Sequence, residues 1–561
     1  AGSLSKGKAG VPIDADWLTF VTRLLDSLKT LKWRYTEGTT KRGRADLGFI
    51  NATGCTSVYG STFPYNPYPF PWTSHLFQDA PSVAMGIFEG HMAKMAEGFK
   101  AIRMAEMELA GKHDIKQMEE ELAYFKWDKF TEEEWRLCPP VVAVGGDGAM
   151  YDIGFQNLSR ALASGMPVKV LVVDTQVYSN TGVQACTSGF ISQVSDMAPY
   201  GPAWRGKEET RKEMALIGMA HRTTYTVNGA PIHYTHLIES YIDGLNSRRP
   251  ALFNIYAPCQ PEHAIPDEAS ERQSKMAVES RAYPLMVFDP DAGATWEECL
   301  SLEGNPAMDD DWPTYTLKYQ GEDGNEGSME IPMTFADFAL TEGRFRKHFR
   351  MAPRDTWNEN MVPIAEFLEL SAEDREGVYP FVWGVDRKNQ LMRVICSAEL
   401  VASSEERLAH WITLKGLAGK LGKVDPEEIA DKVRSETAGK LAASLYAMLG
   451  GSGAAPALDL GGGAVPGLAG VAAPAAAEGF EPAWIEGPLC TACDECIDIN
   501  PKIFQYNADN QAQVINPKGG PYKDIVRSAE KCPADCIHPG TPWDATEKGL
   551  DKLITRAEKY Q

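Results

Sequence analysis

The sequence predicts an α/β protein whose main domain contains a doubly wound parallel sheet, followed near the C-terminus by a small α+β domain. Three observations lead to this prediction. Short apolar runs such as "PPVVAVGG", "VKVLVVD" and "PALFNIYA" alternate with long helical patterns, which is typical of a parallel sheet covered by helices on both faces. A segment made almost entirely of Gly, Ala and Pro occupies 450–479. The segment after it carries closely spaced cysteines.

These patterns divide the chain into four regions. Residues 1–290 form the predicted α/β domain, and residues 291–449 extend it without recognisable chemistry. Within this extension, "DRKNQLMRVICSAELVASSEERLAHWITLKGLAGKLG" predicts a strand followed by a helix. Residues 450–479 cannot bury enough apolar surface to order themselves, so they predict a flexible linker with a reach of roughly 30 Å. Residues 480–561 form the small separate domain.

The composition limits the partners of the protein. The chain has 561 residues and a formal net charge of −22, so we expect no nucleic-acid partner, because phosphate binding needs a basic surface. No apolar run reaches the roughly 18–20 residues of a membrane helix, and no secretory signal pattern is visible. We therefore expect a cytoplasmic protein with no membrane segment. Four of the eleven cysteines have a cluster spacing, which favours an intracellular metal protein over a disulfide scaffold.

Polar residues follow two neighbouring strands of the predicted sheet. Asp147 lies between Gly146 and Gly148 at the end of one strand, and Thr175 follows 28 residues later at the end of the next. One strand–helix–strand crossover fits this separation, and parallel sheets bind ligands at the carboxyl ends of their strands. A carboxylate, a hydroxyl and a nearby backbone carbonyl suit Mg²⁺, which also takes phosphate oxygens. An Asp in an ordinary turn is the alternative, which the polar string "DTQVYSNTG" at this distance disfavours.

The C-terminal domain contains a specific cysteine pattern. Cys490, Cys493 and Cys496 form a C-x₂-C-x₂-C motif, and Cys532 follows 36 residues later, directly before a proline. Three thiolates on one loop with a remote fourth before proline is the bacterial ferredoxin arrangement. We therefore predict a ferredoxin-like domain in which these four cysteines bind one [4Fe-4S] cluster. A zinc site is the alternative.

A second cluster is not expected in this domain. Asn500 stands where a two-cluster ferredoxin has a further cysteine, and the remote segment contains only "KCPADC". Cys536 is left over, and we expect it to be a buried spare thiol.

The region around Asp147 resembles the thiamine diphosphate domain of pyruvate:ferredoxin oxidoreductases, in the 2-oxoacid:ferredoxin oxidoreductase family. The segments "INATGCTSVYGSTFP", "PWTSHLFQDAPSVAMGI" and "SRAYPLMVFDP" also look like this family. The resemblance covers roughly residues 17–290. Residues 486–545 resemble single-cluster ferredoxins.

The resemblance implies a set of site residues. Asp147 and Thr175 would bind Mg²⁺ through their side chains, and Val177 through its carbonyl. Asn180 and Cys55 would lie beside the reacting thiamine and are the catalytic candidates. The full set of implied cofactor-binding residues is Gly54, Cys55, Thr56, Gly146, Asp147, Gly148, Ala149, Thr175, Val177, Asn180 and Thr181.

The resemblance also implies the reaction. It is the thiamine-dependent oxidative decarboxylation of a 2-oxoacid, pyruvate in the first place, to acyl-coenzyme A and CO₂, or the reverse. Electrons would pass to a ferredoxin or flavodoxin, because the thiazolium is the electron sink for the carbanion and clusters accept single electrons. The alternatives are another 2-oxoacid such as 2-oxoglutarate, a non-oxidative thiamine-dependent decarboxylase, or an electron-transfer protein with a non-catalytic α/β domain. The cluster motif argues against the second, and the metal-site spacing argues against the third.

Two parts of the family pattern are missing. We find no pyrimidine-binding domain with an activating Glu, so we expect it on another subunit of a multimeric complex. The family carries a further cluster beside the thiamine, for which Cys55 and Cys259 remain here. The upstream cysteine pair is replaced around Ser27 and Thr30, and we favour loss of this cluster over ligands from elsewhere. Three further residues, Cys186, His75 and His263, lie in family-like segments or near the polar loop.

Overall fold

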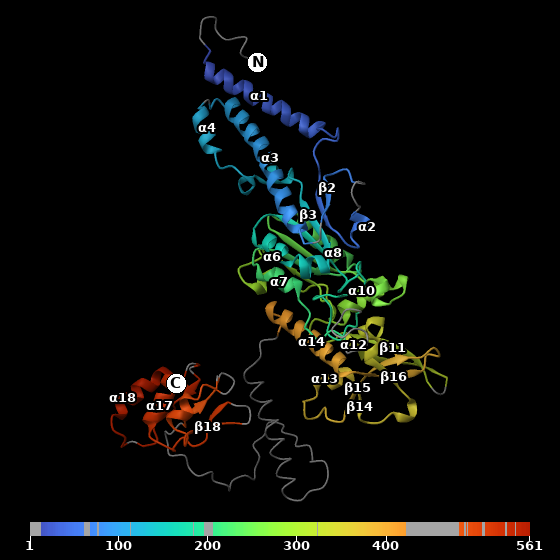
Figure 1. Ribbon diagram of the computed structural model, residues 1–561, viewed down its shortest axis with the longest axis vertical. Coiled ribbons are helices and arrows are strands. Elements are labelled where there is room, and N and C mark those ends of the chain that lie inside the picture. Colours follow the sequence, from blue (N-terminus) through green and yellow to red (C-terminus); the bar gives the residue numbers. More distant parts are fainter. Residues whose placement is uncertain are drawn as a thin grey trace, which may run out of the picture. The chain divides into compact units, whose positions relative to one another are not determined.

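The computed structural model shows two compact units, Ala1–Asp425 and Pro426–Gln561, each described here by itself (Figure 1). The described residues are 13–60, 68–75, 78–112, 114–182, 184–195, 206–321, 324–421, 482–486, 490, 492–507, 511–532, 534, 536–544 and 546–560. The predicted linker at 450–479 lies outside them, and the predicted domain boundaries stay predictions.

The first unit is built on an eight-stranded sheet. Its strand order is β10-β9-β7-β8-β4-β3-β1-β2, and the pairs from β7 to β2 are all parallel. The strands are β1 (Gly48–Ala52), β2 (Trp72–His75), β3 (Val141–Gly146), β4 (Val168–Asp174), β7 (Tyr225–Gly229), β8 (Ala251–Tyr256), β9 (Met286–Phe288) and β10 (Leu300–Ser301). The predicted parallel sheet is therefore confirmed, except that β9 and β10 pair antiparallel at one edge.

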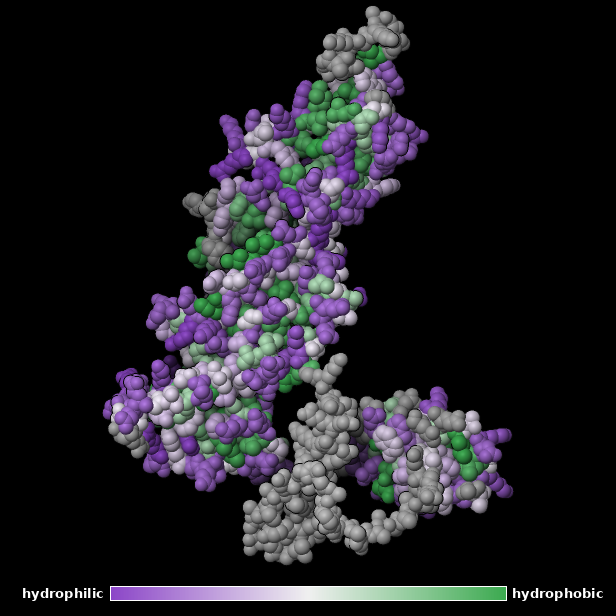
Figure 2. All heavy atoms as spheres, turned by 180° about the vertical axis from the view of Figure 1, so that it is seen from behind, coloured by the Kyte–Doolittle hydropathy of each residue, from purple (hydrophilic) through white to green (hydrophobic). Residues whose placement is uncertain are grey.

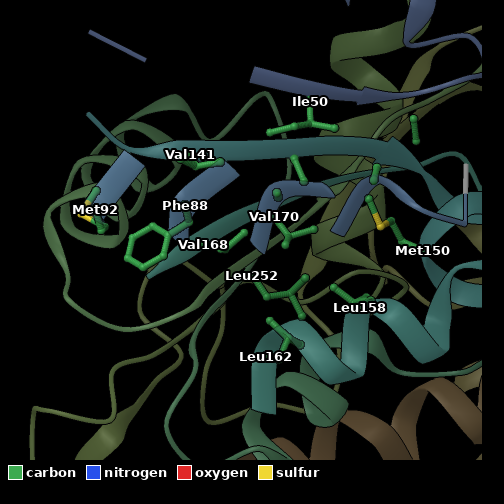
Figure 3. Close-up of a cluster of buried hydrophobic side chains, with 14 of the residues drawn as sticks. Ile50, Phe88, Met92, Val141, Met150, Leu158, Leu162, Val168, Val170 and Leu252 are labelled. Atoms are coloured by element: carbon green, nitrogen blue, oxygen red, sulfur yellow. The ribbon is translucent and has the colours of Figure 1, made fainter. Parts of the chain in front are cut away.

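Helices cover both faces of this sheet, as the alternating sequence pattern predicts. On one face α3 (Ala80–Leu109) and α6 (Phe155–Ala163) contribute Phe88, Met92 and Leu158 to a core with Val170 of β4 (Figure 3). On the other face α8 (Tyr234–Asn246) packs its apolar residues against the opposite side chains of β8. Because the central strands are buried on both faces, their sequences are continuous Val- and Ile-rich runs.

Further helices and a small hairpin complete this domain. They are α1 (Ala15–Thr36), α2 (Ser57–Gly60), α4 (Ile115–Glu121), α5 (Glu132–Arg136), α7 (Met214–Ala220), α9 (Gln260–His263), α10 (Ser270–Glu279), α11 (Trp296–Cys299) and the small hairpin β5 (Val177–Tyr178) with β6 (Gln184–Ala185). Helices α1 and α3 lie side by side, and Gly98 permits this approach, since a Cβ there would lie 2.8 Å from Leu31 Cδ1. Figure 2 shows hydrophilic side chains over much of the surface, with apolar side chains gathered in patches over this helical part.

The extension of the first unit has its own sheet but shares a core with the main domain. Strands β13 (Phe349–Ala352), β16 (Leu391–Cys396), β15 (Tyr379–Val385) and β14 (Met361–Pro363) form a four-stranded sheet, beside the hairpin β11 (Thr314–Gln320) and β12 (Glu326–Pro332). Helices α12 (Phe335–Leu340), α13 (Ile364–Glu369) and α14 (Ala398–Leu417) accompany it. The predicted strand and helix correspond to β16 and α14. Phe190 and Tyr283 of the main domain pack in one cluster with Phe335 and Leu400 of the extension.

The second unit is small and mixed, as predicted for an α+β domain. Strand β17 (Trp484–Ile485) pairs with β20 (Ile537–His538), and β18 (Phe504–Tyr506) pairs with β19 (Ala512–Val514). Helices α16 (Glu495–Ile499), α17 (Tyr522–Lys531) and α18 (Leu550–Ala557) complete it. Ile503, Phe504 and Val526 are fully buried in its core. Among the helices of the described ranges, none is long and apolar enough to span a membrane.

Candidate functional site

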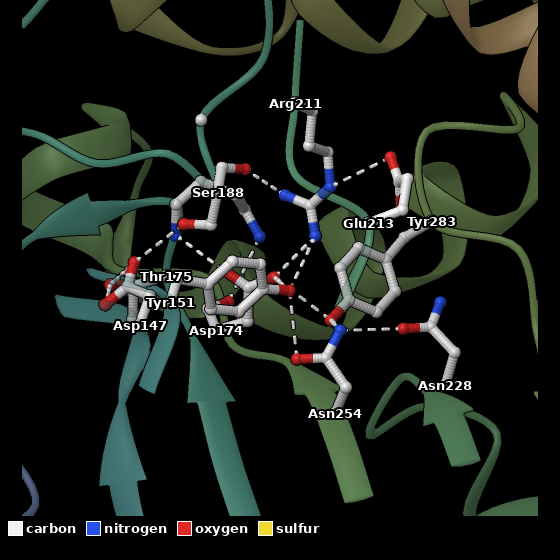
Figure 4. Close-up of polar contacts among 12 residues, drawn as sticks. Asp147, Tyr151, Asp174, Thr175, Ser188, Arg211, Glu213, Asn228, Asn254 and Tyr283 are labelled. Atoms are coloured by element: carbon white, nitrogen blue, oxygen red, sulfur yellow. Dashed lines mark hydrogen bonds and ion pairs between the residues drawn. The ribbon is translucent and has the colours of Figure 1, made fainter. Parts of the chain in front are cut away.

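The polar residues predicted at the strand ends come together at one edge of the sheet. Asp147 follows β3 and Thr175 follows the neighbouring parallel strand β4. Both carboxylate oxygens of Asp147 lie 3.3 Å from Thr175 Oγ1, and that hydroxyl lies 3.0 Å from the carbonyl oxygen of Val177. The Val177 N–H also donates to Asp147 Oδ2 at 2.7 Å (Figure 4). The three oxygen groups expected to bind a cation are therefore grouped around one point.

The turn between Thr175 and Val177 depends on an unusual backbone conformation. Gln176 has a φ of +58°, in the left-handed region that residues other than Gly rarely adopt. Its backbone N–H donates to Asp174 Oδ1 at 3.1 Å, and its carbonyl accepts from Gln193 Nε2 at 2.9 Å. Its side chain donates to the Asp174 carbonyl at 3.1 Å and accepts from Arg344 at 3.1 Å. The reversal brings the Thr175 hydroxyl and the Val177 carbonyl to the same side of the turn.

Asp147 is a buried carboxylate whose local charge is not balanced. Only 4% of its surface is exposed. Burial, followed by repulsion from the Asp174 carboxylate, raises the pKa of Asp147 to about 8. Within the described part of the chain no cationic side chain forms an ion pair with it. Ionising such a group is costly unless a cation compensates it, so this donor set fits Mg²⁺.

A cavity of about 430 Å³ opens beside these groups. Ten of the eleven predicted cofactor-binding residues line it; the exception is Val177, whose side chain is buried. The structure adds lining residues that the sequence did not identify, namely Thr53, Val173, Tyr178, Ser179 and Gln184. A Cβ at Gly148 would lie 2.4 Å from the Tyr178 ring. The glycine is therefore required for the close approach of these two segments.

The two catalytic candidates lie close together in the lining of the cavity. Cys55 Sγ lies 4.0 Å from Asn180 Oδ1, and Cys55 is exposed. Partial burial of the thiol is the main cause that raises the pKa of Cys55, and Cys259, Asp147 and Glu262 raise it further. A raised thiol pKa favours a contact role for Cys55 over a nucleophilic one.

A buried polar network, which the sequence pattern does not predict, supports the end of β4. Arg211 Nη2 donates to Asp174 Oδ2 at 2.6 Å, and both side chains are 1% exposed or less. The hydroxyls of Tyr151 and Tyr283 donate to the same carboxylate oxygen at 2.9 and 3.1 Å. Arg211 also donates to the carbonyl of Ser188. Arg211 therefore joins Asp174, at the end of β4, to Ser188, as Figure 4 shows.

The three remaining candidates have different surroundings. His263 is fully buried, and its Nε2 lies 2.8 Å from the Thr175 carbonyl, to which it donates. His75 lies at the surface, 3.3 Å from Asp79. Cys186 is 2% exposed, and its Sγ lies 3.3 Å from Ser188 Oγ, which is itself 3.3 Å from Asp147. His263 and Cys186 thus lie directly behind the cavity.

In the second unit the four predicted cluster cysteines line one cavity. The lining includes Cys490, Cys493, Cys496 and Cys532, and also Cys536. The backbone N–H of Ala512 donates to Cys490 Sγ at 3.3 Å, and Cys532 Sγ lies 3.4 Å from Cys536 Sγ. A thiolate set of this kind fits an iron–sulfur cluster. The residue types thus fit a cluster, but the structure does not gather these thiols around one ion, since no group of three or more His, Cys, Asp or Glu side chains in the described residues is placed to hold a metal.

The loop around Cys493 has an unusual backbone conformation, and the pKa of the Cys496 thiol that follows it is raised. Ala492 and Asp494 have φ angles of +52° and +65°, so the backbone curls around Cys493. Burial, followed by Cys493 and Cys490, raises the pKa of Cys496 to about 11. Clustered thiols of this kind are deprotonated when they bind metal.

Comparisons with known proteins match both units. Residues 135–255 match the family model "Thiamine pyrophosphate enzyme, C-terminal TPP binding domain", and residues 485–539 match "4Fe-4S single cluster domain of Ferredoxin I". The chain is 29% identical to the pyruvate:ferredoxin oxidoreductase of Moorella thermoacetica over 311 residues, which is 48% of this chain and 25% of that protein. It is 26% identical to pyruvate synthase subunit PorB of Methanocaldococcus jannaschii over 244 residues, which is 44% of this chain and 71% of that subunit.

The chain spans about a quarter of the length of the Moorella enzyme but most of the PorB subunit. Among solved structures, a 2-oxoglutarate:ferredoxin oxidoreductase from Magnetococcus marinus matches with 14% identity and a TM-score of 0.27, over 45% of this chain and 74% of that chain. The chain thus carries a thiamine-diphosphate-binding domain and a C-terminal single-cluster ferredoxin-like domain, and it is similar in sequence to pyruvate:ferredoxin oxidoreductases and pyruvate synthase subunits.

Proposed function

We propose that this chain is the thiamine-diphosphate-binding subunit of a complex that oxidatively decarboxylates pyruvate. Pyruvate and coenzyme A would give acetyl-coenzyme A, CO₂ and a proton, with two electrons passed one at a time to a ferredoxin or flavodoxin, or the reverse. The observation that carries the proposal is the grouping of Asp147, Thr175 and Val177 beside a cavity, in a chain that also holds a four-cysteine cluster domain.

Different residues around the cavity would bind the cation, the diphosphate and the reacting end of the cofactor. Asp147, Thr175 and Val177 would hold Mg²⁺. Gly146, where a Cβ would meet only the Val173 carbonyl oxygen at 3.9 Å, leaves room for a diphosphate near it. When bound, thiamine diphosphate supplies the thiazolium that accepts the electrons of the decarboxylated 2-oxoacid. Asn180 and Cys55 border the open part of the cavity, where they would contact the reacting end and limit the access of water.

The site is incomplete on this chain. Asp147 is the only carboxylate among the described residues that line the cavity, so these residues supply no second carboxylate there to activate the pyrimidine. The activating Glu would come from a second subunit, in line with PorB relatives that are themselves named subunits. We place the complex in the cytoplasm, with coenzyme A as co-substrate.

Purification of the complex tests this function directly. Adding pyruvate and coenzyme A should produce CO₂ and the electron paramagnetic resonance signal of a reduced [4Fe-4S] cluster, and the isolated 561-residue chain should turn nothing over. Parallel assays with 2-oxoglutarate identify the substrate. Binding of thiamine diphosphate without cluster reduction by any 2-oxoacid would contradict the oxidoreductase function.

Iron content tests the predicted loss of the cluster beside the thiamine. A chain whose only cluster is held by the four C-terminal cysteines should contain about four iron atoms. About eight would mean that Cys55 and Cys259 hold a second cluster together with ligands from elsewhere.

A further inference from the structure

The extension contacts the cation-binding turn from behind. Arg344, in the 3₁₀ helix Gly343–His348, donates from Nη2 to Gln176 Oε1 at 3.1 Å. Its Nη1 donates to Gln193 Oε1 at 3.2 Å, and Gln193 in turn donates to the Gln176 carbonyl. Arg344 therefore holds the Gln176 side chain directly and its backbone through Gln193.

Glu342 holds Arg344 in place, and the neighbouring His263 holds Thr175 by a separate contact. Its Oε2 accepts from Arg344 Nε at 2.6 Å, and both side chains are 1% exposed or less. Its Oε1 lies 3.6 Å from His263 Nδ1 and accepts from Gln273 Nε2 at 3.2 Å. His263 donates through Nε2 to the Thr175 carbonyl at 2.8 Å. Gln176 is thus linked to Glu342 through Arg344, whereas Thr175 is held by His263, whose Nδ1 makes no hydrogen bond to Glu342.

These contacts account for a strained residue at a functional turn. A residue other than Gly in the left-handed region costs free energy and persists only when its surroundings over-determine it. Gln176 is fully buried, and all four of its polar groups have partners. Two of these four contacts depend on Arg344 or on Gln193, to which Arg344 is bonded.

We propose that Glu342 and Arg344 are positioning residues that impose the left-handed conformation of Gln176 and so bring the Thr175 hydroxyl and Val177 carbonyl together for a divalent cation. The cation itself rests on the function proposed above. The extension, which has no recognisable chemistry in its sequence, thereby has a role at the site.

A charge-neutral variant tests this role. Arg344→Met alone would leave the Glu342 carboxylate buried and uncompensated, so the test variant is Glu342→Gln/Arg344→Met. The concentration of Mg²⁺ that gives half-maximal thiamine diphosphate binding to the full chain should rise by about tenfold or more, the usual effect of losing groups that orient a metal ligand. Arg393→Met is the matched control, since Arg393 lies on the extension sheet over Trp357 and Phe381 and should leave this concentration unchanged.

Gln176→Gly separates positioning from general destabilisation. Gly adopts a positive φ without strain, so in the Glu342→Gln/Arg344→Met background it should restore most of the Mg²⁺ dependence, and the two changes should be non-additive. Tight Mg²⁺-dependent binding by the Glu342→Gln/Arg344→Met variant, or a loss that Gln176→Gly does not rescue, would overturn the proposal.

A second measurement does not depend on the cofactor. Hydrogen exchange of the Val177 N–H, which donates to Asp147, should become faster in the Glu342→Gln/Arg344→Met protein and slower again with Gln176→Gly. Unchanged exchange would overturn the positioning role. If exchange behaves as expected but no variant, nor the wild type, binds thiamine diphosphate in the purified complex, the positioning role stands and the proposed function fails.

Discussion

Asp147 is the residue on which the site depends most, because it is a buried carboxylate that no cationic side chain in the described residues balances. The hydroxyl and carbonyl oxygens near it can complete a cation site but cannot replace its charge. The relative contributions of Asp147 and Thr175 can therefore be predicted.

Asp147→Asn should weaken Mg²⁺-dependent retention of thiamine diphosphate by about 100-fold or more, because several kcal/mol of charge attraction are lost and each 1.4 kcal/mol is tenfold. Thr175→Val removes a neutral ligand and should cost only about tenfold. Equilibrium dialysis of the folded variants measures both effects. Stoichiometric cofactor in a folded Asp147→Asn protein would contradict the assignment.

Cys532 and Cys536 offer a matched pair at the second site, since their sulfurs are 3.4 Å apart and both line the same cavity. The sequence spacing assigns the ligand role to Cys532. Cys532→Ser should therefore lose the [4Fe-4S] absorbance and most of the iron, and Cys536→Ser should keep both. Equal iron loss in the two variants would show that Cys536 is a ligand as well.

At the scale of elements, the ends of β3 and β4 are held by a buried ion pair rather than by strand pairing alone. Arg211 and Asp174 are both almost fully buried, and Tyr151 and Tyr283 complete the hydrogen bonds of the carboxylate. A buried pair is strongly destabilised when one partner is removed, because the other charge remains uncompensated.

Arg211→Met should lower the free energy of unfolding by about 3–5 kcal/mol. Arg249→Met is the control, because Arg249 and Asp291 form an exposed pair that should contribute about 1 kcal/mol or less. Chemical denaturation of the two variants compares them. Adding Asp174→Asn to Arg211→Met should recover part of the loss, and equal effects of Arg211→Met and Arg249→Met would contradict the importance of the network.

The ends of β3 and β4 could be predicted from the sequence, but the turn that follows β4 could not. Asp147 and Thr175 could be identified because each follows a buried Val-rich strand, and the ends of parallel strands meet at one edge. Gln176 could not be identified as left-handed, since no residue pattern marks that conformation in a residue other than Gly. Its partner Arg344 is 168 positions away, and pairing across such a distance leaves no local periodicity.

At the scale of the whole molecule, the chain carries two candidate sites. They lie far apart in the sequence and rest on separate hydrophobic cores. The first unit carries the candidate thiamine site on its own hydrophobic core, and the second unit carries the cysteine cavity on another. Electrons can pass between two such centres only when they come close together. We therefore expect the residues that separate the two sites in the sequence to set how the two chemistries are coupled.

The composition of 450–479 predicts a flexible linker with a reach of roughly 30 Å, although these residues lie outside the described ranges. Such a linker should tolerate added length, because doubling it costs only about 0.6 kcal/mol in closure entropy. Shortening it to a few residues should slow cluster reduction by 2-oxoacid by about tenfold or more, since a linker too short to span two sites reduces their effective concentration to near zero. Binding of thiamine diphosphate should not change.

A Gly/Ser replacement of the same length is the control and should reduce the cluster at the wild-type rate, measured by stopped-flow absorbance. If the shortened chain reduces its cluster as fast as the wild type, the cluster domain is docked permanently, and the coupling is set by a fixed interface rather than by the reach of the linker.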